Sequence, residues 1–151
     1  MERRGGNTKM ERNSKIIVLD ASVIVKWFNQ EIYTDNALIL KDNYLKKEYI
    51  IYEPSLLFYE VSNALRYNSE LGAKDVIQAI QSLLELQLKV VRIEKWFLEA
   101  ISLAYKHGIT IYDSAYIALG LSLNVPIYTA DEKLEKKVQL SDVIHIKQVK
   151  T

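Results

Sequence analysis

Short apolar runs alternate with longer amphipathic segments along most of the chain. Residues 16–19, Ile-Ile-Val-Leu, form a continuous apolar run typical of a strand buried on both faces. Similar runs at 49–52 and 89–93 predict a second and a third strand. Two more strands are expected at 125–129 and 143–146.

The segments between these strands have apolar residues three and four positions apart, which predicts helices. Pro54 suits the first turn of one helix, whose apolar stripe includes Leu57, Val61 and Leu65. The expected helices are 21–29, 33–47, the helix after Pro54, 73–88, 95–107, 112–124 and 132–138. This alternation predicts one α/β domain with a mostly parallel sheet covered by helices on both sides.

The first 14 residues differ from the rest. Residues 1–14 contain four basic side chains and almost nothing apolar, so we expect a flexible basic leader followed by one folded domain over 15–151. A nucleic-acid-binding arm is the alternative interpretation of this leader. The longest apolar runs, 16–28 and 109–123, are shorter than the roughly 18 residues of a membrane span, and each contains an aspartate. We therefore expect no membrane segment and a cytoplasmic location.

The composition excludes several kinds of functional site. A chain of 151 residues with 49% apolar and 26% charged residues is an ordinary globular protein of one domain. The absence of cysteine excludes disulfides, thiolate zinc sites and thiol nucleophiles. A net charge of +1 argues against a protein that coats nucleic acid by bulk charge. Of the two histidines, His145 alternates with Ile144 and Ile146, and we expect it to point away from the core.

Four acidic residues stand out by their positions. Asp20 follows the first strand, and Asp131 follows the fourth. Asp113 opens a helix, and Glu60 lies at the edge of the apolar stripe after Pro54. Aspartate is also a favoured helix N-cap, which is the simpler explanation for each aspartate taken alone. Because ligands of open α/β sheets bind beyond the carboxyl ends of the strands, we expect these carboxylates to gather at one edge.

Carboxylates that face one another repel unless a cation lies between them. Oxygen ligands without cysteine or histidine suit a hard ion such as Mg²⁺ or Mn²⁺. Such an ion can hold a phosphate oxygen and activate water for attack on phosphorus. Ser22 and Thr129, each two residues from an acidic residue, are candidates to orient that water or a ligand; local turn bonding is the alternative.

Glycine-rich phosphate loops and a nucleophile elbow are missing, which disfavours nucleotide binding through such loops and serine hydrolysis. Receiver domains and haloacid-dehalogenase-type phosphatases need a second aspartate near the first, but Asp20 stands alone.

Four segments together resemble the signatures of PIN-domain ribonucleases, and in particular the VapC toxins of VapBC toxin–antitoxin pairs. The segments are Val-Leu-Asp-Ala-Ser-Val (18–23), Pro-Ser-Leu-Leu-Phe-Tyr-Glu-Val-Ser-Asn-Ala-Leu (54–65), Tyr-Asp-Ser-Ala-Tyr-Ile-Ala-Leu (112–119) and Tyr-Thr-Ala-Asp-Glu-Lys-Leu (128–134). The resemblance extends over about 16–146, and the order and spacing of all four segments match.

This resemblance implies a central parallel sheet of four or five strands and an endoribonuclease that depends on Mg²⁺ or Mn²⁺. It places four metal-holding carboxylates and two small polar residues in the site: Asp20, Glu60, Asp113 and Asp131, with Ser22 and Thr129 beside them. It also implies a homodimer and a VapB-like antitoxin that covers the active site. The alternatives are a PIN nuclease of RNA processing and a PIN fold used as a non-catalytic binding scaffold. The RNA target and the number of metal ions are not set by the sequence.

Overall fold

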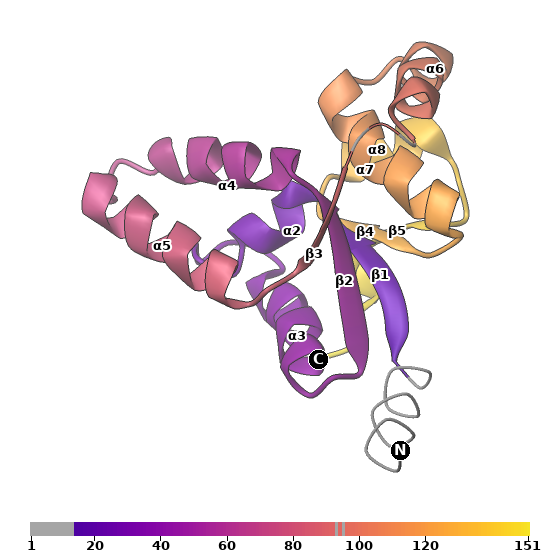
Figure 1. Cartoon of the computed structure of the whole chain (residues 1–151). Helices are drawn as coiled ribbons and strands as arrows, with labels where there is room; N and C mark the ends of the chain where they lie inside the picture. Colours follow the sequence, from indigo (N-terminus) through magenta and orange to yellow (C-terminus); the bar gives the residue numbers. More distant parts are fainter. Residues whose placement is uncertain (1–13, 93, 95) are drawn as a thin grey trace.

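A five-stranded, all-parallel sheet runs through the computed structural model, which describes residues 14–92, 94 and 96–151 (Figure 1). Apart from Ser14, the predicted basic leader lies outside the described residues. The strand order is β3-β2-β1-β4-β5. The strands are β1 (Lys15–Leu19), β2 (Tyr49–Pro54), β3 (Lys89–Val91), β4 (Ile127–Thr129) and β5 (Val143–His145). The prediction of a mostly parallel α/β sheet is confirmed.

Helices cover the sheet from two sides (Figure 1). On one side α2 packs against α4, α4 against α5, and α3 against β2; on the other, α7 packs against β1, β2 and β4, with α6 packed on α7. The helices are α2 (Ala21–Val25), α3 (Thr34–Leu45), α4 (Leu56–Arg66), α5 (Ala73–Glu85), α6 (Phe97–His107), α7 (Ile111–Leu123) and α8 (Glu132–Val138), followed by the 3₁₀ helix η2 (Ile146–Gln148). None of the helices in the described ranges has the length and apolar character needed to cross a membrane.

The order of the strands reverses beside the central strand, β1. From β1 the chain moves outward through β2 to β3, and later returns to add β4 and β5 on the other side of β1. The carboxyl ends of β1 and β4 therefore lie side by side at the point where the strand order reverses. In open α/β sheets this point is where ligands bind.

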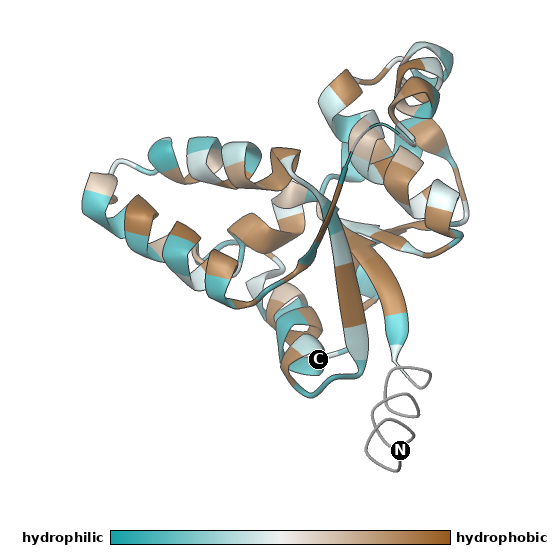
Figure 2. Cartoon of the chain, viewed as in Figure 1, coloured by the Kyte–Doolittle hydropathy of each residue, from teal (hydrophilic) through white to brown (hydrophobic). Residues whose placement is uncertain are grey.

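β1 and α7 each contribute an unbroken run of buried residues to the core. Ile17, Val18 and Leu19 of β1 are almost completely buried, and β1 is largely apolar along its length (Figure 2). Residues 114–120 of α7 are all buried, so this helix is apolar around most of its circumference. A helix of that kind belongs in an interior rather than at a surface. It presses directly on the strands that carry the site.

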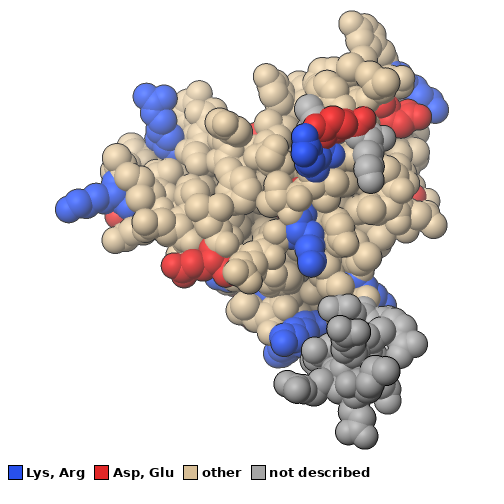
Figure 3. Space-filling model, viewed as in Figure 1, with Lys and Arg blue, Asp and Glu red and all other residues tan. Residues whose placement is uncertain are grey.

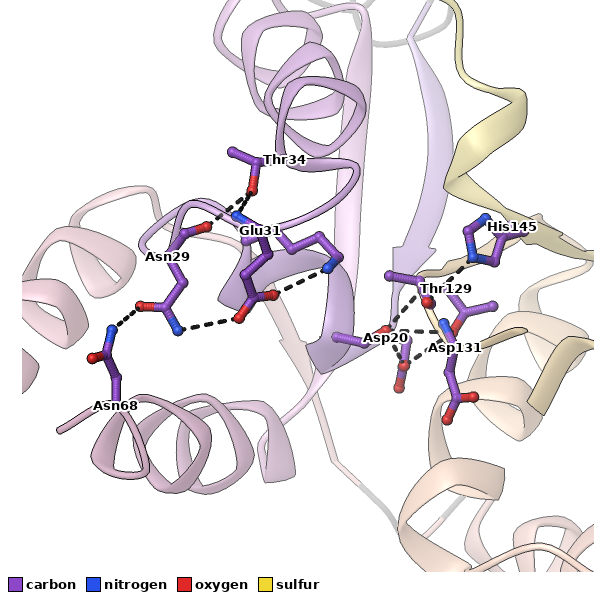
Figure 4. A network of polar contacts seen from close by, with 11 residues as sticks. Asp20, Asn29, Glu31, Thr34, Asn68, Thr129, Asp131 and His145 are labelled. Carbon is purple, nitrogen blue, oxygen red and sulfur yellow. Dashed lines mark hydrogen bonds and ion pairs between the residues drawn. The ribbon is translucent and has the colours of Figure 1, made fainter. Parts of the chain in front are cut away.

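The first helix is shorter than the sequence pattern predicts. The pattern predicts a helix over 21–29, but α2 ends at Val25 and the chain continues in turns to Asn29. The first residue after α2, Lys26, is buried, and its Nζ lies 3.0 Å from Oε1 of Glu31 in the loop that follows. This ion pair holds the turn that replaces the end of the predicted helix (Figure 4).

Gly120 allows α7 to approach β4 closely. A Cβ at this position would overlap the buried side chain of Ile127. We therefore expect Gly120→Ala to destabilise the fold by about 1–3 kcal/mol through overpacking, despite a gain of about 1 kcal/mol in helix propensity. Urea unfolding measures this difference.

Gly72→Ala is the control for steric overlap, since a Cβ at that position meets nothing closer than 3.8 Å. Because Gly72 is the N-cap of α5, its alanine loses only capping preference, and it is expected to destabilise the fold less than Gly120→Ala. A Gly120→Ala protein as stable as the wild type would show that α7 and β4 are not in close contact.

Candidate active site

The four acidic residues singled out by sequence lie on elements that meet at the carboxyl end of the central strands. Asp20 directly follows β1, and Asp131 directly follows β4, its neighbour in the sheet. Glu60 lies on α4, and Asp113 lies in the first turn of α7. The two helices approach this end of the sheet from opposite sides (Figure 1).

Asp20 is the most buried member of this group, with a relative exposure of 5%. Although it occupies the N-cap position of α2, its side chain makes no capping hydrogen bond. Instead, its Oδ2 accepts hydrogen bonds from the hydroxyls of Ser22 at 2.6 Å and Thr129 at 3.1 Å (Figure 4). The simple interpretation of Asp20 as a helix cap is therefore wrong, and its carboxylate is fixed by two short polar side chains.

The environment of Asp20 favours its neutral form. Burial raises the pKa of Asp20 to about 7, and the negative charges of Asp113 and Glu60 add to this effect. The hydrogen bonds from Ser22 and Thr129 lower the pKa and offset part of the rise. The charges of Asp113 on α7 and Glu60 on α4 therefore influence the protonation of Asp20 at the end of β1.

Glu60 and Asp113 show the same mutual effect. Burial, followed by the charge of Asp113, raises the pKa of Glu60. Burial, followed by the charge of Asp131, raises the pKa of Asp113. Asp113 is not a helix cap either, because the hydroxyl of Thr110 accepts its N–H at 3.0 Å and caps α7.

Asp131 is both a helix cap and a member of the acidic group. Its Oδ1 accepts the backbone N–H of Leu134 at 3.1 Å and caps α8, as the sequence allowed. The cap does not use Oδ2. Since the charge of Asp131 raises the pKa of Asp113, this carboxylate also belongs to the group. In the close-up view Asp131 lies next to Thr129, to whose hydroxyl its backbone N–H donates (Figure 4).

Ser22 and Thr129 connect Asp20, at the junction of β1 and α2, with the β4–α8 loop that carries Asp131. Ser22 Oγ accepts the backbone N–H of Ala130 at 2.9 Å, and Thr129 Oγ1 accepts the backbone N–H of Asp131 at 3.1 Å. Each hydroxyl therefore donates to Asp20 and accepts from the β4–α8 loop. This arrangement fixes the distance between the start of α2 and the β4–α8 loop.

His145 also binds the β4–α8 loop, contrary to its predicted outward orientation. It is fully buried on β5, and its ring packs edge-on against Tyr33. Its Nδ1 accepts the N–H of Lys147 at 2.9 Å, which leaves Nε2 to donate to the carbonyl of Ala130 at 3.2 Å (Figure 4). The prediction was wrong because Val143 and His145 share the buried face of β5, whereas Ile144 is only partly buried and Ile146 already belongs to η2.

Glu53, at the end of β2, is a further carboxyl group that the sequence analysis missed. It is fully buried, and its Oε1 accepts the N–H of Leu19, the residue before Asp20, at 2.7 Å. The signal was available, because Glu53 stands at the carboxyl end of a strand just as Asp20 does. It was missed because the apolar run predicts a strand that ends at residue 52, whereas β2 continues to Pro54.

The donor set fits a divalent cation. Asp20, Glu60, Asp113 and Asp131 offer only oxygen ligands, and three of these groups have raised pKa values partly because of one another. A hard cation would remove that repulsion. Within residues 14–92, 94 and 96–151, no three acidic or histidine side chains stand close enough to form a ready-made metal site. Metal binding would therefore draw the carboxylates together.

A groove adjoins the acidic residues. It has a volume of about 1,160 Å³ and runs between α4 and α5, with Glu60 and Tyr112 in its wall. Its lining is mostly apolar, and the exposed tyrosines 59 and 112 stand beside two of the acidic residues. On the face seen in Figure 3, Lys and Arg side chains are scattered rather than gathered.

Comparisons with known proteins agree with this architecture. Residues 17–140 match the PIN domain family model. The chain is 30% identical over 126 residues to ribonuclease VapC3 of Pyrobaculum aerophilum, which covers 80% of this chain and 93% of the relative.

Solved structures share the fold. PAE2754 from Pyrobaculum aerophilum has a TM-score of 0.62 and 24% identity, covering 89% of this chain and 92% of that protein. VapC20 of Mycobacterium tuberculosis, described as a sarcin-ricin loop cleaving toxin, has a TM-score of 0.62 and 13% identity over 80% of this chain and 93% of that protein. VapBC2 from Rickettsia felis, bound to a promoter DNA fragment, has a TM-score of 0.59 and 18% identity over 86% and 96% of the two chains.

Proposed function

Because this chain belongs to the PIN-domain family, we propose that it is a metal-dependent endoribonuclease and the toxin of a VapBC-type toxin–antitoxin pair. The relative with 30% identity is a VapC ribonuclease that this chain covers over 93% of its length. The observation that carries the proposal is the buried carboxylate of Asp20, which Ser22 and Thr129 hold in place and on which the charges of Asp113 and Glu60 act. The reaction is hydrolysis of an RNA phosphodiester bond by water.

Asp20, Glu60, Asp113 and Asp131 are the residues that would hold Mg²⁺ or Mn²⁺. When bound, such an ion neutralises phosphate charge and lowers the pKa of water. Ser22 and Thr129 keep the Asp20 carboxylate in one orientation through their hydrogen bonds. Because these hydroxyls also accept the backbone N–H groups of the β4–α8 loop, they fix the position of Asp131 relative to Asp20.

A VapB-like antitoxin, a homodimeric state and a cytoplasmic location are part of the proposal. The solved relatives include VapBC2 of Rickettsia felis and FitAB bound to a DNA fragment, which supports an antitoxin partner. The groove beside Glu60 is a surface that such a partner could cover.

Expression of the protein in a bacterial host without an antitoxin is expected to stop growth. Asp113→Asn removes one carboxylate of the site and should restore growth at equal protein level. Colony counts after induction, with immunoblots for expression, measure the effect. Asp142→Asn, an aspartate outside the acidic group, is the control and should still stop growth.

Unimpaired growth in the presence of soluble wild-type protein that cleaves RNA in vitro would contradict the toxin assignment. That result would favour a nuclease of RNA processing. Unimpaired growth together with absence of cleavage would favour the non-catalytic scaffold.

A further inference from the structure

Glu53 is a carboxyl group in the interior that the proposed reaction does not use. It lies near the end of β2 with no exposed surface. Its Oε1 accepts the backbone N–H of Leu19 at 2.7 Å, while its Oε2 is buried and has no hydrogen-bond partner in the described part of the chain. A buried carboxyl oxygen without a partner destabilises a fold, so its presence calls for a compensating role.

The position of Glu53 connects it to Asp20. The paired register of β1 and β2 ends at Val18 and Tyr52, so the next N–H on this edge of β1, that of Leu19, is bound by the Glu53 side chain. On the other edge, the N–H of Asp20 donates to the carbonyl of Tyr128 on β4 at 2.9 Å. The backbone that carries the Asp20 carboxylate is thus held from both sides, once by a strand and once by a side chain.

The hydroxyl of Tyr116, on α7, is a second buried polar group that interacts with the same carboxylates. It makes no hydrogen bond of good geometry among the residues described, but its interaction with Glu60 offsets part of the rise in the pKa of that carboxyl. Burial and then the charges of Glu53, Glu60 and Asp20 raise the pKa of the hydroxyl itself. Burial and then the charge of Asp20 raise the pKa of Glu53 well above its ordinary value. Of these two groups, Glu53 is the one whose free oxygen has no partner among the described residues.

We propose that Glu53 is a positioning residue for the cation site: by binding the Leu19 N–H it holds Asp20 in the orientation that receives a divalent ion. This inference rests on the proposed function only for the assumption that Asp20 binds the ion. It does not make Glu53 a metal ligand. Without this acceptor the end of β1 loses its tie to β2, and Asp20 can turn away from Glu60 and Asp113.

The test compares Mn²⁺ affinity of the full chain by isothermal titration calorimetry. Glu53→Met keeps the approximate length of the side chain but removes the acceptor, and is expected to weaken Mn²⁺ binding roughly 10- to 100-fold, as for other groups that orient metal ligands. Glu53→Gln keeps an oxygen for the Leu19 N–H and should stay within about threefold of the wild type, since the loss follows the acceptor alone. Glu48→Met, an exposed glutamate just before β2, is the matched control and should bind as the wild type does.

Two outcomes would overturn the proposal. The first is a folded Glu53→Met protein that binds Mn²⁺ as tightly as the wild type, which would leave Glu53 a structural residue only. The second is a Glu53→Gln protein that loses as much affinity as Glu53→Met, which would mean that charge and not the hydrogen bond is what matters. If Glu53→Met does not fold, Glu53→Asp, which is too short by one methylene, takes its place with the same expected loss.

Failure of the proposed function would give a different pattern. Mn²⁺ binding that depends on Glu53, in a protein that cleaves no RNA, would support the positioning role and reject the ribonuclease. RNA cleavage that needs Asp20, together with Mn²⁺ affinity that ignores Glu53, would reject the positioning role alone. A wild-type protein that binds no Mn²⁺ would overturn both.

Discussion

The Asp20→Asn protein is expected to cleave RNA roughly 100- to 1,000-fold more slowly than the wild type, the scale on which loss of a key electrostatic group acts. The asparagine side chain keeps the shape and one oxygen for the bonds from Ser22 and Thr129, so the local structure is preserved. What is lost is the charge that faces Glu60 and Asp113. Initial cleavage rates at saturating Mn²⁺ measure the effect.

Asp35→Asn is the matched control, because Asp35 is an exposed aspartate in the first turn of α3. It should cleave RNA at the wild-type rate. Equal cleavage by the Asp20→Asn and wild-type proteins would mean that the cleaving site lies elsewhere or in a contaminant.

The same substitution is expected to stabilise the metal-free protein at high pH. The pKa of Asp20 is raised in the folded state from 3.8 to about 7, so between these pH values the folded chain keeps a proton that the unfolded chain releases. The stability of the wild type therefore falls as pH rises through this window and stays low above it. Asparagine cannot ionise and avoids the loss.

In EDTA, the melting temperature of Asp20→Asn should exceed that of the wild type by roughly 5–10 °C at pH 8 and by less than about 2 °C at pH 4. Added Mn²⁺ should reduce or reverse the difference at pH 8, since it binds and stabilises the folded wild type more strongly than the variant. Differential scanning calorimetry at the two pH values measures both effects. An Asp20→Asn protein that is less stable than the wild type at pH 8 without metal would show that the charged form of Asp20 does not destabilise the fold.

The spacing of apolar residues predicted most helices correctly, because these helices are long enough for their buried face to be visible in the sequence. α7 begins and ends one residue from the expected positions, and α8 has the predicted bounds. α2 was predicted too long, because the apolar pattern continues to Phe28 although the chain already turns at Lys26, whose side chain pairs with Glu31 in the next loop. The strand predicted over 89–93 ends at residue 93, and the helix predicted over 95–107 begins at residue 95. Both of these residues lie outside the described residues.

The site was predictable to the extent that topology determines it. Parallel strands bring their carboxyl ends together, so Asp20 and Asp131 could be placed at one edge from the sequence alone. The hydroxyl bonds of Ser22 and Thr129 to one oxygen of Asp20 could not, because they depend on the spacing of β1 and β4. Glu53 was missed for the related reason that its burial follows from the pairing of β2 with both β1 and β3.

The central claim is that the clustered carboxylates hold a divalent ion with which the protein cuts RNA. The most direct measurement is cleavage of total and transfer RNA by purified, antitoxin-free wild-type protein with millimolar Mn²⁺ or Mg²⁺, then with EDTA, then with the metal restored in excess. We predict cleavage with metal, none with EDTA, and recovery when metal is returned. Cleavage that persists in EDTA, or its absence in all three conditions from a folded protein, would contradict the claim.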